Sequence, residues 1–389
     1  MKALFFIPII LFPFMITAQK NSVKNINKLS FELLKQINKA DGNKNVFISA
    51  YSISNAMAMT YTGAKAETKT EMENILFPNS ENTIAQDLKA LNDALSFNRA
   101  IELYSANNIW IRQNIEVKKR FTKNLKLNFN ADIGKANFSN PEGVEKARND
   151  INTWVEEKTK NNIKDFLAKG ILDESTVIVL VNAVYYHAQW KNRFEEKNTY
   201  QDIFHTIAGN EVKTDYMRSV LTIPYYKNNE LAAVEIPYEN NEASFIIVMP
   251  DNFENFAHKF DAQYFEKITQ NFNNKKVSLT IPKFKEESEY ELIEYFKNMG
   301  MSKLFSSQAD LSGIAGSKDI KISNIIHKAI IEINESGTEA SAATAVIGSR
   351  SVAGSNDVVV FKANRPFFYF IKEKSTGVLL FAGCFVAAE

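Results

Sequence analysis

The chain is poor in cysteine and histidine. Its 389 residues include one cysteine, Cys384, and a single thiol excludes both an intramolecular disulfide and a metal site built from several cysteines. Cys384 lies in an apolar run, residues 379–386, where we expect a small buried side chain. No histidine occurs in H-E-x-x-H or in another metal-ligand spacing. We therefore expect no metal site at the four histidines, which are His187, His205, His258 and His327.

An excess of charge of either sign is also absent. The 46 Lys and Arg residues face 45 Asp and Glu residues, which gives a formal net charge of +1. So small a net charge creates no large field to attract nucleic acid or an anionic membrane, and we expect neither as a partner. Glycine (14 residues) and proline (9 residues) are sparse, and no linker tract or fixed-period repeat is visible. We expect a single domain, residues 19–389.

Sequence motifs of common enzyme sites are missing as well. The chain has no G-x-S-x-G motif, which would place an activated serine on a strand-to-helix turn. It also lacks a G-x-x-x-x-G-K-[ST] loop and a G-x-G-x-x-G motif after a strand, two signatures of nucleotide binding. We therefore expect no enzyme activity, no catalytic residues and no cofactor. A serine hydrolase would need a serine beside a histidine, and no motif supplies that pair.

No hydrophobic run reaches the length of a membrane span. A span needs roughly 18–25 apolar residues, whereas the run at residues 3–16 is shorter and contains Pro8 and Pro13. This run follows Lys2 and precedes Thr17 and Ala18, the order typical of a signal peptide with a small-residue cleavage site. We interpret residues 1–18 as a signal peptide. The mature chain would then be exported, either secreted to the extracellular space or released into a periplasm, without a membrane anchor.

Hydrophobic periodicity predicts helices in the first part of the chain and strands later. Helical spacing occurs at residues 26–37, 52–62 and 141–166. Runs of β-branched and aromatic residues predict strands at residues 177–186, 232–236, 243–249, 277–284, 367–371 and 378–385. This order favours an α+β fold. The strand at 177–186 is apolar on both faces except at Asn182, so we expect this amide to join an internal polar network.

One segment, residues 335–357, fits neither a core element nor an ordinary loop. It joins two strand-like runs, residues 329–334 and 358–361, and its length is far above that of usual connections. Between residues 338 and 348 every second residue is small or apolar, as in a strand. A segment without bulk or charge on one face is able to slip between existing strands, because no buried charge opposes it. We therefore predict that this segment is able to form a strand.

Several motifs in the same order resemble the serpins, the serine-protease-inhibitor family. The resemblance covers the chain from about residue 25 to residue 385. The matching segments are residues 45–49, 52–59, 63–68, 152–159, 163–165, 180–186 with Trp190, 281–284, 309–313, 327–329, 334–345 and 361–371.

The resemblance implies a serpin fold, with helices packed around a large central mixed β-sheet, two smaller sheets and an exposed reactive-centre loop at about residues 336–357. It further implies a monomer that inhibits serine endopeptidases as a suicide substrate. The protease would cut the loop and remain attached as a covalent acyl complex, while residues 337–349 enter the main sheet as a new strand. The alternative is a non-inhibitory serpin that acts as a carrier or chaperone.

The same resemblance implies roles for individual residues. Glu335 and Lys283 would form an ion pair at the top of the sheet, near Trp190. Four polar residues would form the cluster that lets the strands part: Ser49, Ser52, Asn182 and His327. The hinge of the loop matches inhibitory members of the family and comprises Gly337, Thr338, Glu339, Ala340, Ser341, Ala342, Ala343 and Thr344.

Two adjacent peptide bonds are candidates for the scissile bond. The family's usual spacing from Glu335 points to Ser351–Val352, and one residue fewer points to Arg350–Ser351. An Arg350 cut would direct the chain to trypsin-like proteases, because the guanidinium supplies strong charge-assisted recognition. A Ser351 cut would favour elastase-like or subtilisin-like enzymes. We favour the Arg350–Ser351 bond.

Overall fold

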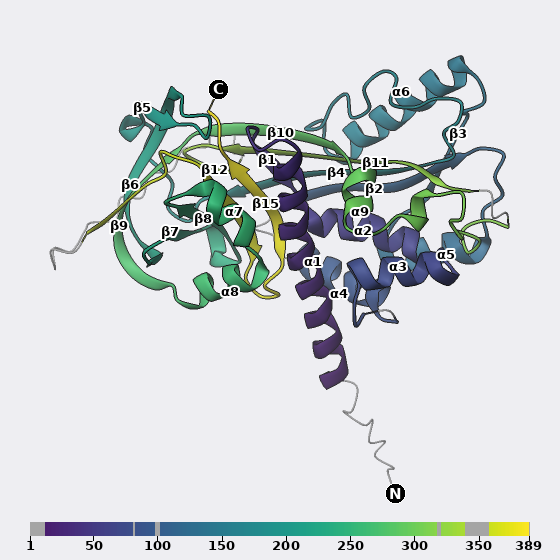
Figure 1. The fold of residues 1–389 in the computed structure, drawn as a ribbon, viewed down its shortest axis with the longest axis horizontal. Coiled ribbons are helices and arrows are strands. Elements are labelled where there is room, and N and C mark those ends of the chain that lie inside the picture. Colours follow the sequence, from purple (N-terminus) through teal and green to yellow (C-terminus); the bar gives the residue numbers. More distant parts are fainter. Residues whose placement is uncertain (1–11, 81, 98–101, 317–319, 339–357, 389) are drawn as a thin grey trace, which may run out of the picture.

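The structure, a computed structural model, describes residues 12–80, 82–97, 102–316, 320–338 and 358–388 (Figure 1). The α-helices are α1 (Phe12–Ala40), α2 (Ala50–Tyr61), α3 (Ala66–Leu76), α4 (Ile84–Phe97), α5 (Lys119–Phe129), α6 (Pro141–Lys158), α7 (Phe253–Lys259), α8 (Ala262–Gln270) and α9 (Ile293–Asn298). Short 3₁₀ turns are η1 (Glu196–Asn198), η2 (Glu239–Asn241) and η3 (Lys303–Phe305).

The strands of these residues are β1 (Val46–Ile48), β2 (Glu102–Arg112), β3 (Ile133–Ala136), β4 (Ile178–Gln189), β5 (Tyr200–His205), β6 (Glu211–Lys227), β7 (Leu231–Pro237), β8 (Ala243–Pro250), β9 (Asn273–Pro282), β10 (Phe284–Glu291), β11 (Ile322–Ile333), β12 (Gly337–Thr338), β13 (Val359–Lys362), β14 (Phe367–Glu373) and β15 (Leu379–Phe385). Helices and a mixed sheet confirm the expected α+β class.

The strands that the structure describes form two sheets. The first has six strands in the order β10-β11-β12-β4-β2-β3, and it is mixed because β4 runs antiparallel to β2 and parallel to β11. The second follows the order β1-β15-β14-β8-β7-β6-β9-β13, with β5 paired to β6. The long strand β6 pairs with β9 and, at its end, with β7. In the described residues the two smaller sheets that we expected are therefore joined through β6 into one.

Strand β4 is covered on both faces, as its apolar sequence predicts. Alternate residues of a strand point to opposite faces of a sheet. The even-numbered residues face the larger core, which includes Leu180, Val184 and Tyr186. The odd-numbered ones, such as Val181, pack in a smaller core beneath α6. In Figure 1, α6 lies on one side of the six-stranded sheet and α2 on the other.

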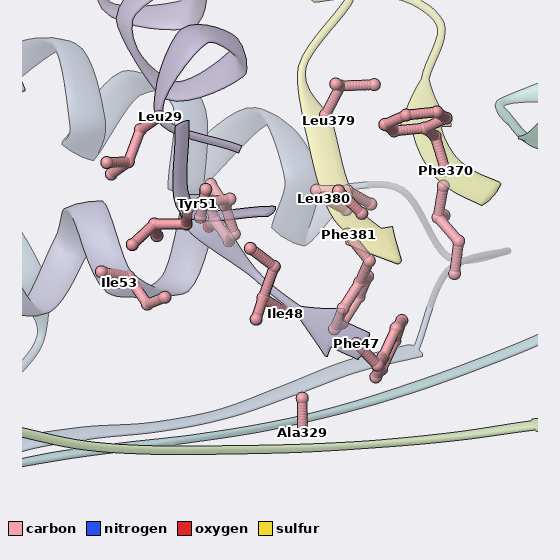
Figure 2. Packing of buried hydrophobic residues seen from close by; sticks show 14 of the residues in the cluster. Leu29, Phe47, Ile48, Tyr51, Ile53, Ala329, Phe370, Leu379, Leu380 and Phe381 are labelled. Carbon is pink, nitrogen blue, oxygen red and sulfur yellow. The ribbon is translucent and has the colours of Figure 1, made fainter. Parts of the chain in front are cut away.

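The larger core joins the two sheets. Phe47 of β1 stacks on Phe381 of β15 with ring centroids 4.9 Å apart, and Ala329 of β11 lies below this pair (Figure 2). All three side chains are fully buried. Because β11 packs directly under β1 and β15, we expect any movement of β11 to disturb this core.

The structure corrects several predicted elements. The helix predicted at residues 141–166 ends at Lys158, because Lys160 and Asn161 adopt positive φ angles of 52° and 63°, which a right-handed helix does not tolerate. The helix predicted at residues 26–37 starts earlier, at Phe12. The sequence patterns predict none of strands β1, β2, β3, β5 and β6, and only the first residue of β10. No helix within the described ranges is long and apolar enough to cross a membrane.

Candidate functional site: the junction of β4 and β11

Strands β4 and β11 are parted at one end by two residues. Gly337 and Thr338 form β12, in which Thr338 pairs with Ala188 of β4 on one side and with Ile333 of β11 on the other, antiparallel in both cases. Farther along, β4 and β11 pair directly and in parallel, from Ile178 opposite Ile322 to Tyr185 opposite Ile330. The chain therefore enters the sheet at residues 337–338, which lie inside it rather than in an exposed loop.

The two inserted residues fit tightly. A Cβ atom on Gly337 would lie 2.1 Å from the carbonyl oxygen of Ala188, so only glycine is accommodated there. Thr338 is fully buried, and its hydroxyl lies 2.5 Å from the hydroxyl of Tyr238. The Tyr238 ring stacks on Trp190 with centroids 4.7 Å apart. The start of the predicted hinge is thus packed as core.

The chain leading into β12 is anchored by an ion pair. Lys283 Nζ lies 2.9 Å from the Glu335 carboxylate, which also accepts a hydrogen bond of 2.7 Å from the Thr199 hydroxyl. Burial raises the pKa of the Glu335 carboxyl, but hydrogen bonds from Thr199 and Lys283 favour the charged form and hold the pKa below its usual value. Glu335 is therefore ionised at neutral pH.

Hydrogen bonds to three backbone carbonyls add to this anchor. The Trp190 indole N–H donates to the carbonyl of Asn334 at 2.8 Å, and the Trp190 backbone N–H donates to the carbonyl of Ser336 at 3.0 Å. The backbone N–H of Phe194 donates to the carbonyl of Glu335 at 2.9 Å. The segment from Asn334 to Ser336 is thus held by three consecutive carbonyls, and the structure brings Glu335, Lys283 and Trp190 together.

The four predicted polar residues also meet, in the middle of the β4–β11 junction. His327 of β11 lies opposite Asn182 of β4 in the parallel register, and their side chains are hydrogen-bonded. The Asn182 amide donates to the Ser52 hydroxyl at 2.6 Å. Ser49 caps helix α2 by accepting from the Ser52 backbone N–H at 3.1 Å. All four residues are fully buried.

Sequence reasoning missed further members of this cluster. Asn107 of β2 lies opposite Asn182, accepts a hydrogen bond from its amide, and also accepts from the Ser52 hydroxyl at 3.3 Å. Ser105, two residues earlier, lies 3.1 Å from the same hydroxyl. The row Asn107–Asn182–His327 therefore crosses three strands. The pair Asn107-Asn108 inside an otherwise strand-like run was the available signal.

Several predicted site residues lie outside the described residues. These are the hinge residues Glu339, Ala340, Ser341, Ala342, Ala343 and Thr344, and the candidate scissile residues Arg350, Ser351 and Val352. Cys384 is fully buried, and burial raises the pKa of its thiol to about 12. Within the ranges that the structure describes, no group of three or more His, Cys, Asp or Glu side chains is placed to hold a metal ion.

Comparisons with known proteins agree with this geometry. A leukocyte elastase inhibitor of Xenopus tropicalis is 33% identical over 368 residues, which cover 91% of this chain and 96% of that protein. A serpin of the insect Tenebrio molitor superposes with a TM-score of 0.86 at 29% identity, covering 95% of this chain and 99% of the other. Human thyroxine-binding globulin, complexed with its ligand, gives a TM-score of 0.86 at 25% identity, with the same coverage.

The family profile described as serpin (serine protease inhibitor) matches residues 24–388, nearly the whole chain. This match accounts for the order of the sequence motifs. It also agrees with the mixed sheet, in which a strand starts between β4 and β11. The chain belongs to the serpin family.

Proposed function

We propose that this chain inhibits serine endopeptidases as a suicide substrate, by inserting its cleaved loop between β4 and β11. The observation that supports this most is strand β12, because Gly337 and Thr338 already occupy the first two positions of that insertion. The remaining junction is a parallel pair, whereas the inserted segment would make two antiparallel ladders. Antiparallel pairing is slightly more stable per residue, and an added strand also adds hydrogen bonds.

The proposed reaction is an interrupted proteolysis. The protease serine attacks the carbonyl of the scissile residue, the peptide bond breaks, and the leaving amine takes a proton from the protease's catalytic base. The amino-terminal part of the loop is then joined to the protease serine as an ester. Insertion of residues 337–349 would carry the attached protease away before water hydrolyses that ester.

The register of β12 predicts where the inserted residues would pair. Thr338 lies opposite Ala188 and Ile333, so in antiparallel continuation Thr344, six residues on, falls opposite Asn182 and His327, each six residues back. A threonine hydroxyl both donates and accepts hydrogen bonds. Thr344 would therefore take the place of the direct His327–Asn182 bond, and the polar cluster would remain satisfied after the strands part.

A mixing experiment tests the proposal. The chain without residues 1–18 is incubated with trypsin and, separately, with an elastase or subtilisin, and the products are analysed by denaturing gel and mass spectrometry. We expect a covalent complex that survives denaturation and a released carboxyl-terminal peptide. A peptide that begins at Ser351 favours trypsin-like targets, and one that begins at Val352 favours elastase-like or subtilisin-like targets.

The same gel also tests the alternative, a non-inhibitory serpin that acts as a carrier or chaperone. Thyroxine-binding globulin, one of the similar structures, is solved with a bound ligand, and a carrier of this kind need not trap proteases. Cleavage in the loop without a covalent complex for every protease tested would favour a non-inhibitory serpin.

We also propose that the chain is exported after removal of residues 1–18. Lys2, the apolar run at residues 3–16 and the small residues at 17–18 support a cleaved signal peptide. The intact mass of the protein recovered from the medium or periplasm of an expressing cell tests this, with an amino terminus at Gln19 as the expected result.

A further inference from the structure

An exposed apolar face lies beside the carboxyl-terminal end of the loop. Val360 of β13 is 73% exposed, Val220 of β6 is 50% exposed, and Val358, just before β13, is 42% exposed. Ser278 of β9 pairs with Val360 on one side and with Val220 on the other, so the two valines stand in one row on the same face of three strands. We call Val220, Val358 and Val360 the valine face.

The valine face occupies an unprotected place in the fold. Among the described strands, β13 ends the order of the nine-stranded sheet. Proteins usually protect such edges with charged side chains, proline or a covering segment, because exposed edges promote association. Val358 and Val360 lie at this edge and Val220 lies on the same face two strands farther in, and three exposed aliphatic side chains so close together point to a partner that covers them.

The length of the chain between the scissile bond and β13 identifies that partner. About seven residues lead from either candidate scissile bond to Val358. A fully extended chain covers at most about 3.6 Å per residue. A protease bound at the scissile bond is therefore held within about 25 Å of Val358. Any such protease arrives next to the valine face.

The charges around the valine face indicate the charge of the partner's surface. Lys362 is neutralised by Asp202 at 2.6 Å, but Arg218 and Lys276, which lie in the neighbouring rows on β6 and β9, have no carboxylate partner in the described part of the chain. Two copies of this chain joined face to face would bring these cations together at the contact. An acidic partner surface would instead be complementary.

We propose that the valine face is a docking surface for the target protease itself, contacting an apolar patch with acidic neighbours beside the protease's active site. This inference rests on the proposed inhibitory function and adds to it a determinant of target choice outside the loop. The contact acts before cleavage, so it raises the rate of association and leaves the later competition between insertion and hydrolysis unchanged.

The test measures the second-order rate constant of inhibition and the stoichiometry of inhibition, with the protease that forms the covalent complex most readily. The variants are Val220→Asp, Val360→Asp and the milder Val220→Thr, which keeps the branched shape. Burying one valine is worth about a tenfold change in affinity, so we expect each Asp variant to inhibit about tenfold more slowly at unchanged stoichiometry. Leu127→Asp is the matched control, because Leu127 on α5 is 64% exposed and α5 lies at the opposite end of the molecule (Figure 1).

Val220 is the deciding position, because it is far from the loop in sequence. Unchanged rates in the Val220 and Val360 variants, with complex formation intact, would overturn the docking surface alone. A slower rate only in Val360→Asp would also overturn it, since Val360 would then act as part of the reactive-centre loop that the protease binds and cuts. A wild-type dimer that Val220→Asp dissociates would reassign the face to self-association. Failure of the wild type to form any covalent complex would refute the proposed function and the docking surface together.

Discussion

His327 accepts a hydrogen bond from the backbone N–H of Ser49 through its Nε2 atom, at 3.1 Å. Since Nε2 accepts, Nδ1 must carry the ring proton and donate it to the side-chain oxygen of Asn182. Both ring nitrogens are thus used in the neutral form. Burial lowers the pKa of His327 to about 3. Protonation would place a proton on Nε2, and the Ser49 N–H would then face another N–H donor instead of an acceptor. The middle of the β4–β11 junction depends on a neutral ring.

Acidification is therefore expected to weaken the native state. The unfolded chain binds a proton on His327 near pH 6.5, whereas the folded chain does so only near pH 3. Between these values the unfolded state holds one proton more, so the free energy of unfolding falls as pH falls, by about 1.4 kcal/mol per pH unit. This contribution is complete above pH 6.5 and declines below it.

Denaturant midpoints measured from pH 7.5 to pH 5 test this expectation, because most carboxylates keep their charge in that range. His327→Gln is the matched control, since its amide does not titrate there. The control is expected to lose less stability than the wild type over the same interval. Equal slopes for the two proteins would contradict the assignment of the pH dependence to His327.

Asn182→Leu is expected to destabilise the fold although the side chains are similar in size. The change leaves the Nδ1–H of His327 without its acceptor and removes a donor to Ser52 and Asn107. Each buried polar atom left without a partner costs about 1–3 kcal/mol, so we expect a total loss of about 2–4 kcal/mol. Thermal unfolding measures it.

The control for this prediction is Asn43→Leu, the same chemical change at an exposed position after α1. Surface changes of this kind stay within about 0.5 kcal/mol. A similar shift in both variants would mean that the loss at position 182 comes from the residue type rather than from the polar cluster.

The central strand could be predicted from the sequence because its signal is local. Residues 177–186 are apolar on both faces, and the structure buries both faces of β4. Strand β10 could not, because it lies at the edge of the six-stranded sheet and is rich in charge: Lys285, Glu287 and Glu289 are exposed, and Glu286 on the other face is charged as well, so no apolar alternation marks it. Such an edge tolerates residues that a central strand excludes.

The polar cluster shows a second limit of sequence reasoning. Asn182 stood out because it interrupts an apolar run, and the resemblance to serpins supplied Ser49, Ser52 and His327. Asn107 was missed, although it contacts Asn182 directly. Its role depends on the register between β2 and β4, which are more than sixty residues apart in the chain, and no local pattern encodes that register.

Lys283→Ala is expected to speed premature insertion of the loop. The Lys283–Glu335 pair is half-buried and holds the segment that leads into β12. Ion pairs of this exposure contribute about 1 kcal/mol, which corresponds to about a fivefold faster conversion. Inhibitory activity that remains after incubation at elevated temperature, together with native gels, measures the conversion.

Lys259→Ala is the matched control, because it removes an ion pair with Glu230 of 2.6 Å on an exposed surface far from β12 in sequence. We expect it to convert at the wild-type rate. If both lysine variants lose activity equally fast, the Lys283–Glu335 pair has no special role in holding the junction closed.

Thr338→Arg is expected to turn the inhibitor into a substrate. Thr338 is fully buried between β4 and β11, and its hydroxyl bonds to Tyr238 within a stack that includes Trp190. A guanidinium at this position would have to be buried without a carboxylate partner, which is costly, so the hinge would leave the sheet. Insertion would then be slower than hydrolysis of the acyl ester, and the protease would be released with the loop cut.

Thr338→Ser separates this effect from a general loss of fold, because serine keeps the hydroxyl and removes only a methyl group. On a denaturing gel we expect Thr338→Ser to form the covalent complex and Thr338→Arg to give only the cleaved chain. Thermal unfolding of the uncleaved Arg variant checks that it is folded before the protease is added. A folded Arg variant that still traps the protease would show that residue 338 need not stay between β4 and β11, and insertion would have to begin elsewhere.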